Sequence, residues 1–319
     1  MKRIAILTSG GDAPGMNAAI RAAVRLTTAR GVEILGVRRG YLGLMNGEFL
    51  PLDSAAVGGI IEEGGTILRT ARCEPFKTGE GERQALAALE RAGVDGLLVV
   101  GGNGSQAGAS RLSQLGLPVV GIPSTIDNDV PGTDQTIGAD SALNTIVQAI
   151  DRIRDTASAH ERTFVVETMG RGCGWLALNA ALASGADIVL IPEAPTPLPE
   201  VAGRVTERRR LRKAHTVIVV AEGAGRGVEV AARLAELTGL EVRATVLGHI
   251  QRGGAPTAFD RILASRLAAA AAEALLGGQG GVLIGVQGRD LVPVPLDRTA
   301  GVRRSLNLDL FRLEGIFSV

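Results

Sequence analysis

The feature that most constrains the fold of this chain is the regular alternation of short apolar runs with longer segments of helical periodicity. The runs that predict strands are residues 3–8, 33–37, 96–100, 118–122, 163–167, 187–191, 216–221, 241–247 and 281–285. The segments that predict helices are residues 15–30, 82–92, 105–115, 139–156, 174–184, 199–213, 229–238 and 258–276. Strands that alternate with helices form right-handed βαβ units, so we expect mostly parallel sheets covered on both faces. The nine strands exceed a usual sheet of about 4–6, which predicts two doubly wound, Rossmann-like α/β domains.

The composition excludes several classes of protein. The chain has 319 residues, 34 basic and 33 acidic side chains and a formal net charge of +1, so no overall field favours nucleic acid. Its two cysteines, Cys73 and Cys173, cannot form a disulfide framework, and no Cys-x-x-Cys pair indicates zinc or redox chemistry. No apolar run approaches the roughly 18 residues of a membrane span, and the first run is too short for a signal peptide. We therefore expect a cytoplasmic protein with no membrane or nucleic-acid partner.

Polar and glycine-rich segments follow the predicted strands directly. Two of them are glycine loops, Ser9-Gly10-Gly11-Asp12 and Gly101-Gly102-Asn103-Gly104-Ser105. Ligands of parallel sheets bind at the carboxyl ends of the strands, where a glycine loop and a helix N-terminus favour phosphate. Neither loop contains the Walker pattern or the G-x-G-x-x-G pattern of dinucleotide-binding proteins. Each loop alone is equally well explained by a tight βα turn, but the two together indicate nucleotide phosphates.

The segment Thr125-Ile126-Asp127-Asn128-Asp129 is the sharper signal for chemistry. In an extended segment, side-chain alternation places Asp127 and Asp129 on the same side. One carboxylate could then accept a hydroxyl proton while the other handles Mg²⁺, and phosphoryl transfer requires both parts. Considered alone, the segment is better explained as a solvated turn rich in Asp and Asn.

Arginines near the ends of predicted elements supply the cations that such a site needs. They are Arg72, Arg162, Arg171, Arg243 and Arg252. An arginine fork matches phosphate oxygens with two hydrogen bonds, although for any single one a surface ion pair is the simpler interpretation. Other basic residues lie near predicted helix ends, where cations ordinarily complement the helix dipole. A second anion site remains open as an alternative for this second group.

Together these segments resemble ATP-dependent 6-phosphofructokinases of the bacterial type. The similarity rests on residues 8–17, 40–44, 70–73, 125–129, 169–171, 247–254 and 256–266, and it covers essentially the whole chain. It implies a glycolytic transferase that moves the ATP γ-phosphoryl group to the 1-hydroxyl of fructose 6-phosphate, with Mg²⁺. It also implies an ATP-binding domain of residues 1–138 and 256–304, a fructose 6-phosphate-binding domain of residues 139–255 and 305–319, and an active site between them. The family forms homotetramers with shared sites.

The resemblance also assigns roles to residues. Asp127 would be the base, and Arg171, Arg72 and the Gly11 backbone would stabilise the moving phosphoryl group beside Thr125. ATP would be bound by Gly11, Tyr41, Arg72, Cys73, Phe76, Lys77, Gly102, Asn103, Gly104 and Ser105. Fructose 6-phosphate would be held by Thr125, Asp127, Met169, Gly170, Arg171, Glu222, His249 and Arg252, with Arg162 and Arg243 from a neighbouring subunit. An effector, ADP or phosphoenolpyruvate, would contact Arg21, Arg25, Arg154, Gly185, Asp187, Lys213 and His215, and Mg²⁺ would be served by Asp129 and Asn103.

This sequence departs from the family pattern at several positions. Asn103 replaces the aspartate of a Gly-Gly-Asp-Gly loop, which predicts weaker use of Mg²⁺ because that ion prefers charged oxygen ligands. Ser54 and Leu211 replace basic effector residues, which predicts weak allosteric control. Gly104 favours ATP, since pyrophosphate-using relatives typically carry Asp at this place.

Two alternatives to this kinase stay open. One is a catalytically impaired paralogue that binds sugar phosphates or acts as a regulatory subunit, in a hetero-oligomer with a sister chain. The other is an enzyme with a different sugar or phosphoryl donor.

Overall fold

The structure is a computed structural model and describes residues 1–317 of the chain. It divides into two compact units, of which unit 1 comprises Met1–Ser141 and Arg252–Arg304, and unit 2 comprises Ala142–Gln251 and the segment from Ser305 onward. The first two divisions therefore lie at 141/142 and 251/252, compared with predicted positions of 138/139 and 255/256. Arg252 accordingly belongs to unit 1 and not to the second domain. Residues 318–319 of the predicted second domain lie outside the described residues.

Unit 1 is built on a seven-stranded sheet in the order β11-β10-β5-β4-β1-β2-β3. The strands are β1 (Arg3–Ser9), β2 (Glu33–Val37), β3 (Phe49–Leu52), β4 (Gly96–Gly101), β5 (Val119–Pro123), β10 (Val282–Gln287) and β11 (Asp290–Pro295). The five central strands are parallel, and β3 and β11 pair antiparallel at the edges. Ser9 pairs with Gly101, and Gly101 with Pro123, so β1, β4 and β5 end at the same level. The loops that follow these three strands therefore meet at one edge.

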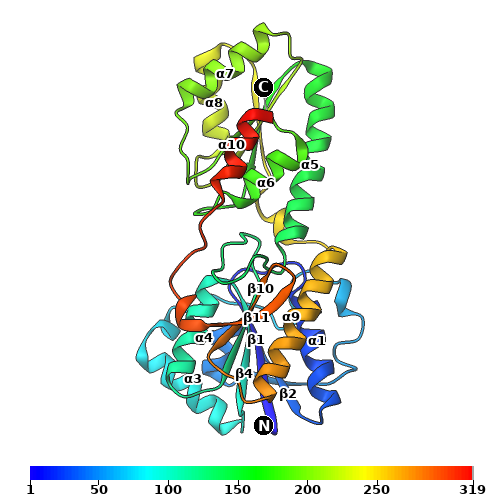
Figure 1. The fold of residues 1–319 in the computed structure, drawn as a ribbon, viewed down its shortest axis with the longest axis vertical. Coiled ribbons are helices and arrows are strands. Elements are labelled where there is room, and N and C mark those ends of the chain that lie inside the picture. Colours follow the sequence, from blue (N-terminus) through cyan, green and yellow to red (C-terminus); the bar gives the residue numbers. More distant parts are fainter. Residues whose placement is uncertain (318–319) are drawn as a thin grey trace. The chain divides into compact units, whose positions relative to one another are not determined.

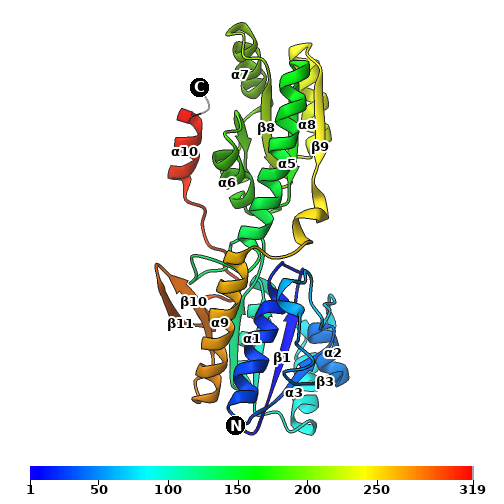
Figure 2. The ribbon, with the colours of Figure 1, turned by 90° about the vertical axis from the view of Figure 1, so that its right-hand side faces the viewer.

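Helices cover both faces of this sheet (Figure 1). On one face α1 (Met16–Ala29) packs beside α9 (Ala258–Leu276), as both views show (Figures 1 and 2). On the other face lie α3 (Gly79–Arg91) and α4 (Asn103–Gln114), with α2 (Gly40–Asn46) packed against α3. Three short 3-10 helices complete the unit: η1 (Ile60–Glu62), η2 (Pro75–Lys77) and η4 (Leu296–Arg298). The core is filled by Ala, Val, Leu and Ile, as the low aromatic content of 3% requires.

Unit 2 contains a four-stranded parallel sheet in the order β7-β8-β6-β9. Its strands are β6 (Thr163–Thr168), β7 (Ile188–Leu190), β8 (Thr216–Ala221) and β9 (Val242–Val246). The helices are α5 (Ala139–His160), α6 (Trp175–Ser184), α7 (Leu198–Arg210), α8 (Gly227–Thr238), η3 (Gly248–Arg252) and α10 (Leu308–Phe317). The first residues of α5, up to Ser141, and the last residue of η3, Arg252, belong to unit 1. Helices α7 and α8 share a buried core with one face of the sheet, and α10 packs on α6 (Figure 2).

Every predicted strand and helix is present, with its boundaries moved by a few residues. The predicted class, two doubly wound and mostly parallel α/β folds, is confirmed by the two sheets and their helical layers. The strands β3 and β11 and the helices α2 and α10 were not predicted. Within residues 1–317, none of the helices combines the length and the apolar character that crossing a membrane requires.

Candidate active site

The loops after β1, β4 and β5 enclose a cavity of about 430 Å³ in unit 1. All ten residues predicted to bind a nucleotide line it, together with Thr125, Asp127 and Arg252. Its volume lies within the range of about 300–1,000 Å³ typical of small-molecule sites. The structure thus brings the two glycine loops and the carboxylate segment to one place, as the parallel topology predicts. We call this space the nucleotide cavity.

An aromatic pair forms one wall of the nucleotide cavity. The rings of Tyr41 and Phe76 stack with centroids 4.1 Å apart and an interplanar angle of 20°. The Tyr41 hydroxyl donates a hydrogen bond to the carbonyl oxygen of Ser105 over 2.6 Å. Burial raises the pKa of Tyr41, so this hydroxyl keeps its proton and remains a donor. These rings form a rigid apolar surface of the kind on which a planar base packs.

Other parts of the cavity lining are suited to anions. Arg252 lies directly over Gly11, where any Cβ would collide with the guanidinium group. Helix α4 begins at Asn103 after Gly102, and no side chain caps its first N–H groups. Free N–H groups at a helix N-terminus and an arginine both attract phosphate. Arg72 and Lys77 add exposed cations to the rim, although Lys77 pairs with Glu74 at 2.8 Å.

Residues 125–136, which we call the Asp127 loop, follow β5 and are closed by their own hydrogen bonds. Asn128 adopts a left-handed conformation with φ of 50°, which asparagine tolerates better than most residues. Its amide donates to the carbonyl oxygen of Asp134 (3.1 Å) and accepts from the N–H of Thr136 (2.9 Å). The hydroxyl of Thr136 in turn donates to the carbonyl oxygen of Thr125 (2.7 Å).

The prediction that Asp127 and Asp129 lie on the same side of an extended segment is wrong. The left-handed Asn128 between them turns the backbone, so Asp127 lines the cavity while Asp129 is buried, with 6% of its surface exposed. The Asp129 carboxylate lies 3.6 Å from Nε of Arg303. Burial raises the pKa of Asp129, and Arg303 and Asn103 oppose that rise. The two carboxylates therefore occupy different environments.

Few protein atoms near Asn103 could coordinate a divalent cation. Asn103 Oδ1 is buried in the cavity wall and has no hydrogen-bond partner among the described residues, while its Nδ2 donates to the carbonyl oxygen of Asp129 at 3.3 Å. Residues 1–317 contain no group of three or more His, Cys, Asp or Glu side chains that could hold a metal. The Asp127 carboxylate lines the cavity and fits a Mg²⁺ that takes most of its ligands from phosphates and water, whereas the buried Oδ1 of Asn103 is not exposed to the cavity.

Unit 2 gathers its own group of predicted residues at the carboxyl edge of its sheet. Met169, Gly170 and Arg171 follow β6, and Glu222 follows β8 with its N–H donating to the carbonyl oxygen of Thr168 (2.9 Å). Gly223 packs against the Arg171 backbone so closely that a Cβ there would collide with it. The loops after β6 and β8 are therefore in contact.

Gln251 links η3 to this group, and no sequence signal indicated it. The side chain is fully buried, accepts a hydrogen bond from the N–H of Met169 (3.2 Å) and donates to the carbonyl oxygen of Gly248 (2.9 Å). It thereby ties the His249 segment to the loop after β6. A glutamine between a histidine and an arginine is too common a pattern to predict such a contact.

Arg162 and Arg243 lie at the opposite, amino edge of the same sheet. Arg162 precedes β6, and Arg243 pairs with Phe164 in the first part of β9. Each forms an ion pair with Glu241, at 2.9 Å and 2.5 Å respectively. The Arg243 and Arg162 side chains lower the pKa of Glu241, which favours its charged form. A strand of six residues spans about 17 Å, so these arginines do not reach the residues that follow β6 in the same unit.

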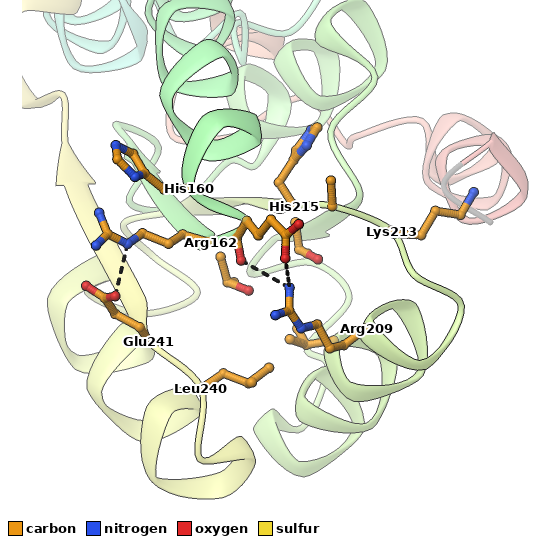
Figure 3. A pocket seen from close by; sticks show the side chains of 12 residues that line it. His160, Arg162, Arg209, Lys213, His215, Leu240 and Glu241 are labelled. Carbon is orange, nitrogen blue, oxygen red and sulfur yellow. Dashed lines mark hydrogen bonds and ion pairs between the residues drawn. The ribbon is translucent and has the colours of Figure 1, made fainter.

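A second cavity, of about 230 Å³, opens at this amino edge and is rich in basic side chains (Figure 3). It is lined by His160, Arg162, Arg209, Lys213 and His215, with Glu161 and Glu241 as the acidic residues. Arg209 donates hydrogen bonds of 3.3 Å to the backbone and the carboxylate of Glu161 (Figure 3). Two of the predicted effector residues, Lys213 and His215, therefore lie in one basic cavity.

The remaining predicted effector residues are placed elsewhere. Arg154 donates to the carbonyl oxygen of Gly185 (2.9 Å), and Asp187 pairs with Arg208 and accepts from the N–H of Val217 (2.7 Å). Arg21 and Arg25 lie on α1 of unit 1. The residues are thus distributed over both units, and only those within each unit are seen to be near one another.

Fold and cavity together define a doubly wound α/β protein with a cavity of about 430 Å³, lined by two glycine loops, at the carboxyl edge of its larger sheet. The sequence model of the family described as Phosphofructokinase matches residues 3–275. ATP-dependent 6-phosphofructokinases of Halalkalibacterium halodurans and Bacillus subtilis are 52% and 51% identical over 319 residues, which is the whole of each chain. The chain therefore belongs to the phosphofructokinase family.

Solved structures are similar to this fold as well. The phosphofructokinase of Saccharomyces cerevisiae has a TM-score of 0.87 and 40% identity, covering 94% of this chain and 45% of that one. The pyrophosphate-dependent phosphofructokinase of Marinobacter aquaeolei has a TM-score of 0.87 and 22% identity, covering 97% of this chain and 86% of that one. This second likeness establishes the fold alone.

Proposed function

We propose that this chain is a glycolytic ATP-dependent 6-phosphofructokinase, which converts D-fructose 6-phosphate and ATP to fructose 1,6-bisphosphate and ADP. The observation that carries the proposal is the convergence of all ten predicted nucleotide residues with Thr125 and Asp127 in one cavity. Enzymes of that name match the chain over its full length at about half identity. A cytoplasmic location accords with such substrates.

In this reaction the 1-hydroxyl oxygen forms a bond to the γ-phosphorus, and the bond between that phosphorus and the β,γ-bridging oxygen breaks. Asp127 accepts the proton of the hydroxyl. Arg72, the Gly11 N–H and Arg252 above it stabilise the charge on the transferred group. The family resemblance assigns the same role to Arg171. Such preorganised electrostatics supplies most of the catalysis in sites of this type.

We propose that Mg²⁺ is the cofactor and arrives bound to the ATP phosphates. When bound, it neutralises the β- and γ-phosphate oxygens. Asn103 lines the cavity, and its side-chain amide would contact a water molecule on the ion. Asp129, which is buried beside Arg303, supports the position of Asn103 through its carbonyl oxygen.

The acceptor sugar phosphate is proposed to bind to Met169, Gly170, Arg171, Glu222, His249 and Arg252. Arg162 and Arg243 lie too far along β6 and β9 to join that group within one chain, which supports their contribution to a neighbouring subunit of a homotetramer. An arginine held in an ion pair with Glu241 is already oriented for such a role. We propose a shared site of this kind.

Regulation is proposed to be weak. Lys213 and His215 line the basic cavity, but Leu211 is 61% exposed beside them in sequence and carries no charge. Ser54 likewise offers no cation. Because each charged hydrogen bond contributes about 1.5–3 kcal/mol, losing two cations leaves little affinity for ADP or phosphoenolpyruvate.

A coupled assay for fructose 1,6-bisphosphate tests the proposal with the wild type, Asp127→Asn and Asn103→Asp. The wild type should turn over, and Asp127→Asn should lower kcat by about 10²–10⁴-fold because the general base is lost. Asn103→Asp should lower the Mg²⁺ concentration needed for half-maximal rate. Turnover by Asn103→Asp alone would instead select the impaired regulatory paralogue, and turnover by the wild type only with another hexose phosphate would change the substrate.

A further inference from the structure

Two arginines at the end of unit 1 contact the Asp127 loop across a long stretch of sequence. The backbone N–H of Arg304 donates to the carbonyl oxygen of Asp129 over 2.9 Å. Nη1 of its guanidinium donates to the carbonyl oxygens of Thr133 (3.0 Å) and Asp134 (2.7 Å), and Nη2 lies 3.5 Å from the Asp134 carboxylate. Arg303 adds its ion pair with Asp129.

These contacts satisfy backbone groups that the Asp127 loop cannot pair through regular structure. A loop without a ladder must find partners for its buried carbonyl groups elsewhere. Arg304 supplies donors to the carbonyls of two buried residues of the loop, Asp129 and Thr133, and to that of the exposed Asp134. The fixed fork of a guanidinium makes this arrangement more rigid than a lysine would.

The contacts of Arg304 with the Asp127 loop affect the position of Asp127 through one residue, Asn128. The carbonyl oxygen of Asp134 accepts hydrogen bonds from Arg304 and from the Asn128 side chain. Asn128 is the left-handed residue that separates Asp127 from Asp129. If the 133–134 segment moved away, Asn128 would lose an acceptor, and the turn that directs Asp127 into the cavity would relax.

We propose that Arg304, assisted by Arg303, is a positioning residue that fixes the Asp127 loop in its reactive conformation. The proposal rests on the phosphofructokinase function proposed above. A base must be held within fractions of an ångström of its productive position, and displacement by about 1 Å can cost 10²-fold in rate. Arg304 is also the last residue of unit 1 before the chain enters unit 2. Its hydrogen bonds to the Asp127 loop therefore fix the end of unit 1 as well as the loop.

The kinetic test compares Arg304→Ala, Arg304→Lys and Arg298→Ala. Arg298 is exposed in η4 of the same C-terminal part of unit 1, so its variant is a matched control for loss of an arginine. Arg304→Ala should lower kcat about tenfold to a hundredfold. Its KM for ATP should stay within about twofold of wild type, since the ten residues predicted to bind ATP all lie outside the Asp127 loop. Arg304→Lys should recover part of kcat, and Arg298→Ala should resemble the wild type.

Hydrogen exchange on the ligand-free protein separates this proposal from the proposed function. In Arg304→Ala the amides of residues 125–136 should exchange faster than in the wild type, whereas those of β1 and β4 should not change. Unchanged exchange in the loop, an unchanged kcat, or an equal rise in KM for ATP and fall in kcat would each overturn the proposal. A wild type without kinase activity would refute the function but leave the exchange result as a test of the anchor.

Discussion

Gly108 of α4 faces the ring of Tyr41 and leaves no room for a side chain. A Cβ at this position would lie 2.7 Å from Cζ and Oη of Tyr41 and 2.9 Å from its Cε2. The ring is 5% exposed, stacked on Phe76 and hydrogen bonded to Ser105, so it can move only toward the cavity that it lines, and the move disrupts both contacts. Gly108→Ala should therefore displace Tyr41.

Three contributions set the size of this effect. Overpacking of a core costs about 1–3 kcal/mol, and loss of the hydrogen bond between Tyr41 and Ser105 costs about 0.5–1.5 kcal/mol more. Alanine contributes about 1 kcal/mol of helix propensity relative to glycine in the other direction. We expect the free energy of unfolding to fall by about 2 kcal/mol, with the overpacking term dominant. Because Tyr41 lines the nucleotide cavity, the KM for ATP should rise about three- to tenfold.

Urea unfolding followed by circular dichroism, together with steady-state kinetics at varied ATP, measures both effects. Gly203→Ala is the matched control, since Gly203 lies within helix α7 and an added Cβ meets no atom within 4 Å. The control should be as stable as the wild type or up to about 1 kcal/mol more stable. A Gly108→Ala protein with wild-type stability and an unchanged KM for ATP would refute the reasoning.

Two further predictions concern buried carboxylates. Asp260 is fully buried and accepts hydrogen bonds from the N–H of Gly138 (2.9 Å) and from the N–H and hydroxyl of Ser141 (2.8 and 2.6 Å). Asp260→Ala should lower the free energy of unfolding by at least about 3 kcal/mol, because each buried donor left alone costs about 1–3 kcal/mol; a loss below about 1 kcal/mol in urea unfolding would contradict this. Burial raises the pKa of Glu314 on α10 from 4.5 to about 7, so the folded state binds this proton more tightly than the unfolded state does. Its stabilising contribution is therefore present below pH 4.5 and is lost as pH rises through about 7. Glu314→Gln should flatten this dependence in thermal melts, and an unaltered pH profile would count against the assignment.

The central strands could be predicted from the sequence because they are continuous apolar runs bounded by glycine loops. The edge strands β3 and β11 could not be predicted in this way. Pro51 in β3 and Pro293 in β11 lack the backbone N–H that a strand donates, so a sequence that contains them does not favour a strand. β3 is held by antiparallel pairing to β2, and β11 is held by a hairpin with β10 that is closed by residues 288–289. Helix α2 begins after Arg39 in a left-handed conformation and contains two glycines, so its local sequence does not favour a helix.

The candidate site was predictable where the resemblance fixed residue types at the ends of strands. The nucleotide cavity contains the ten expected residues, and the fold explains why, since β1, β4 and β5 end in register. The environment of Asp129 was not predictable. It depends on a left-handed Asn128 and on Arg303, a residue 174 positions away in a segment without periodicity. Contacts of that sequence separation leave no local pattern.

The passage of the chain through unit 2 and back has a consequence for protein synthesis. The strands of the smaller sheet end at Val246, before β10 and β11 of the larger sheet have been translated. Because domains generally fold as units during synthesis, we expect the sheet of unit 2 to form before the sheet of unit 1 is complete, and α10 to join unit 2 last. Until β10 emerges, β5 has no neighbour on one side and presents open backbone groups to other nascent chains. Translation of residues 124–281 is therefore the interval in which a chaperone covering that edge would most reduce aggregation.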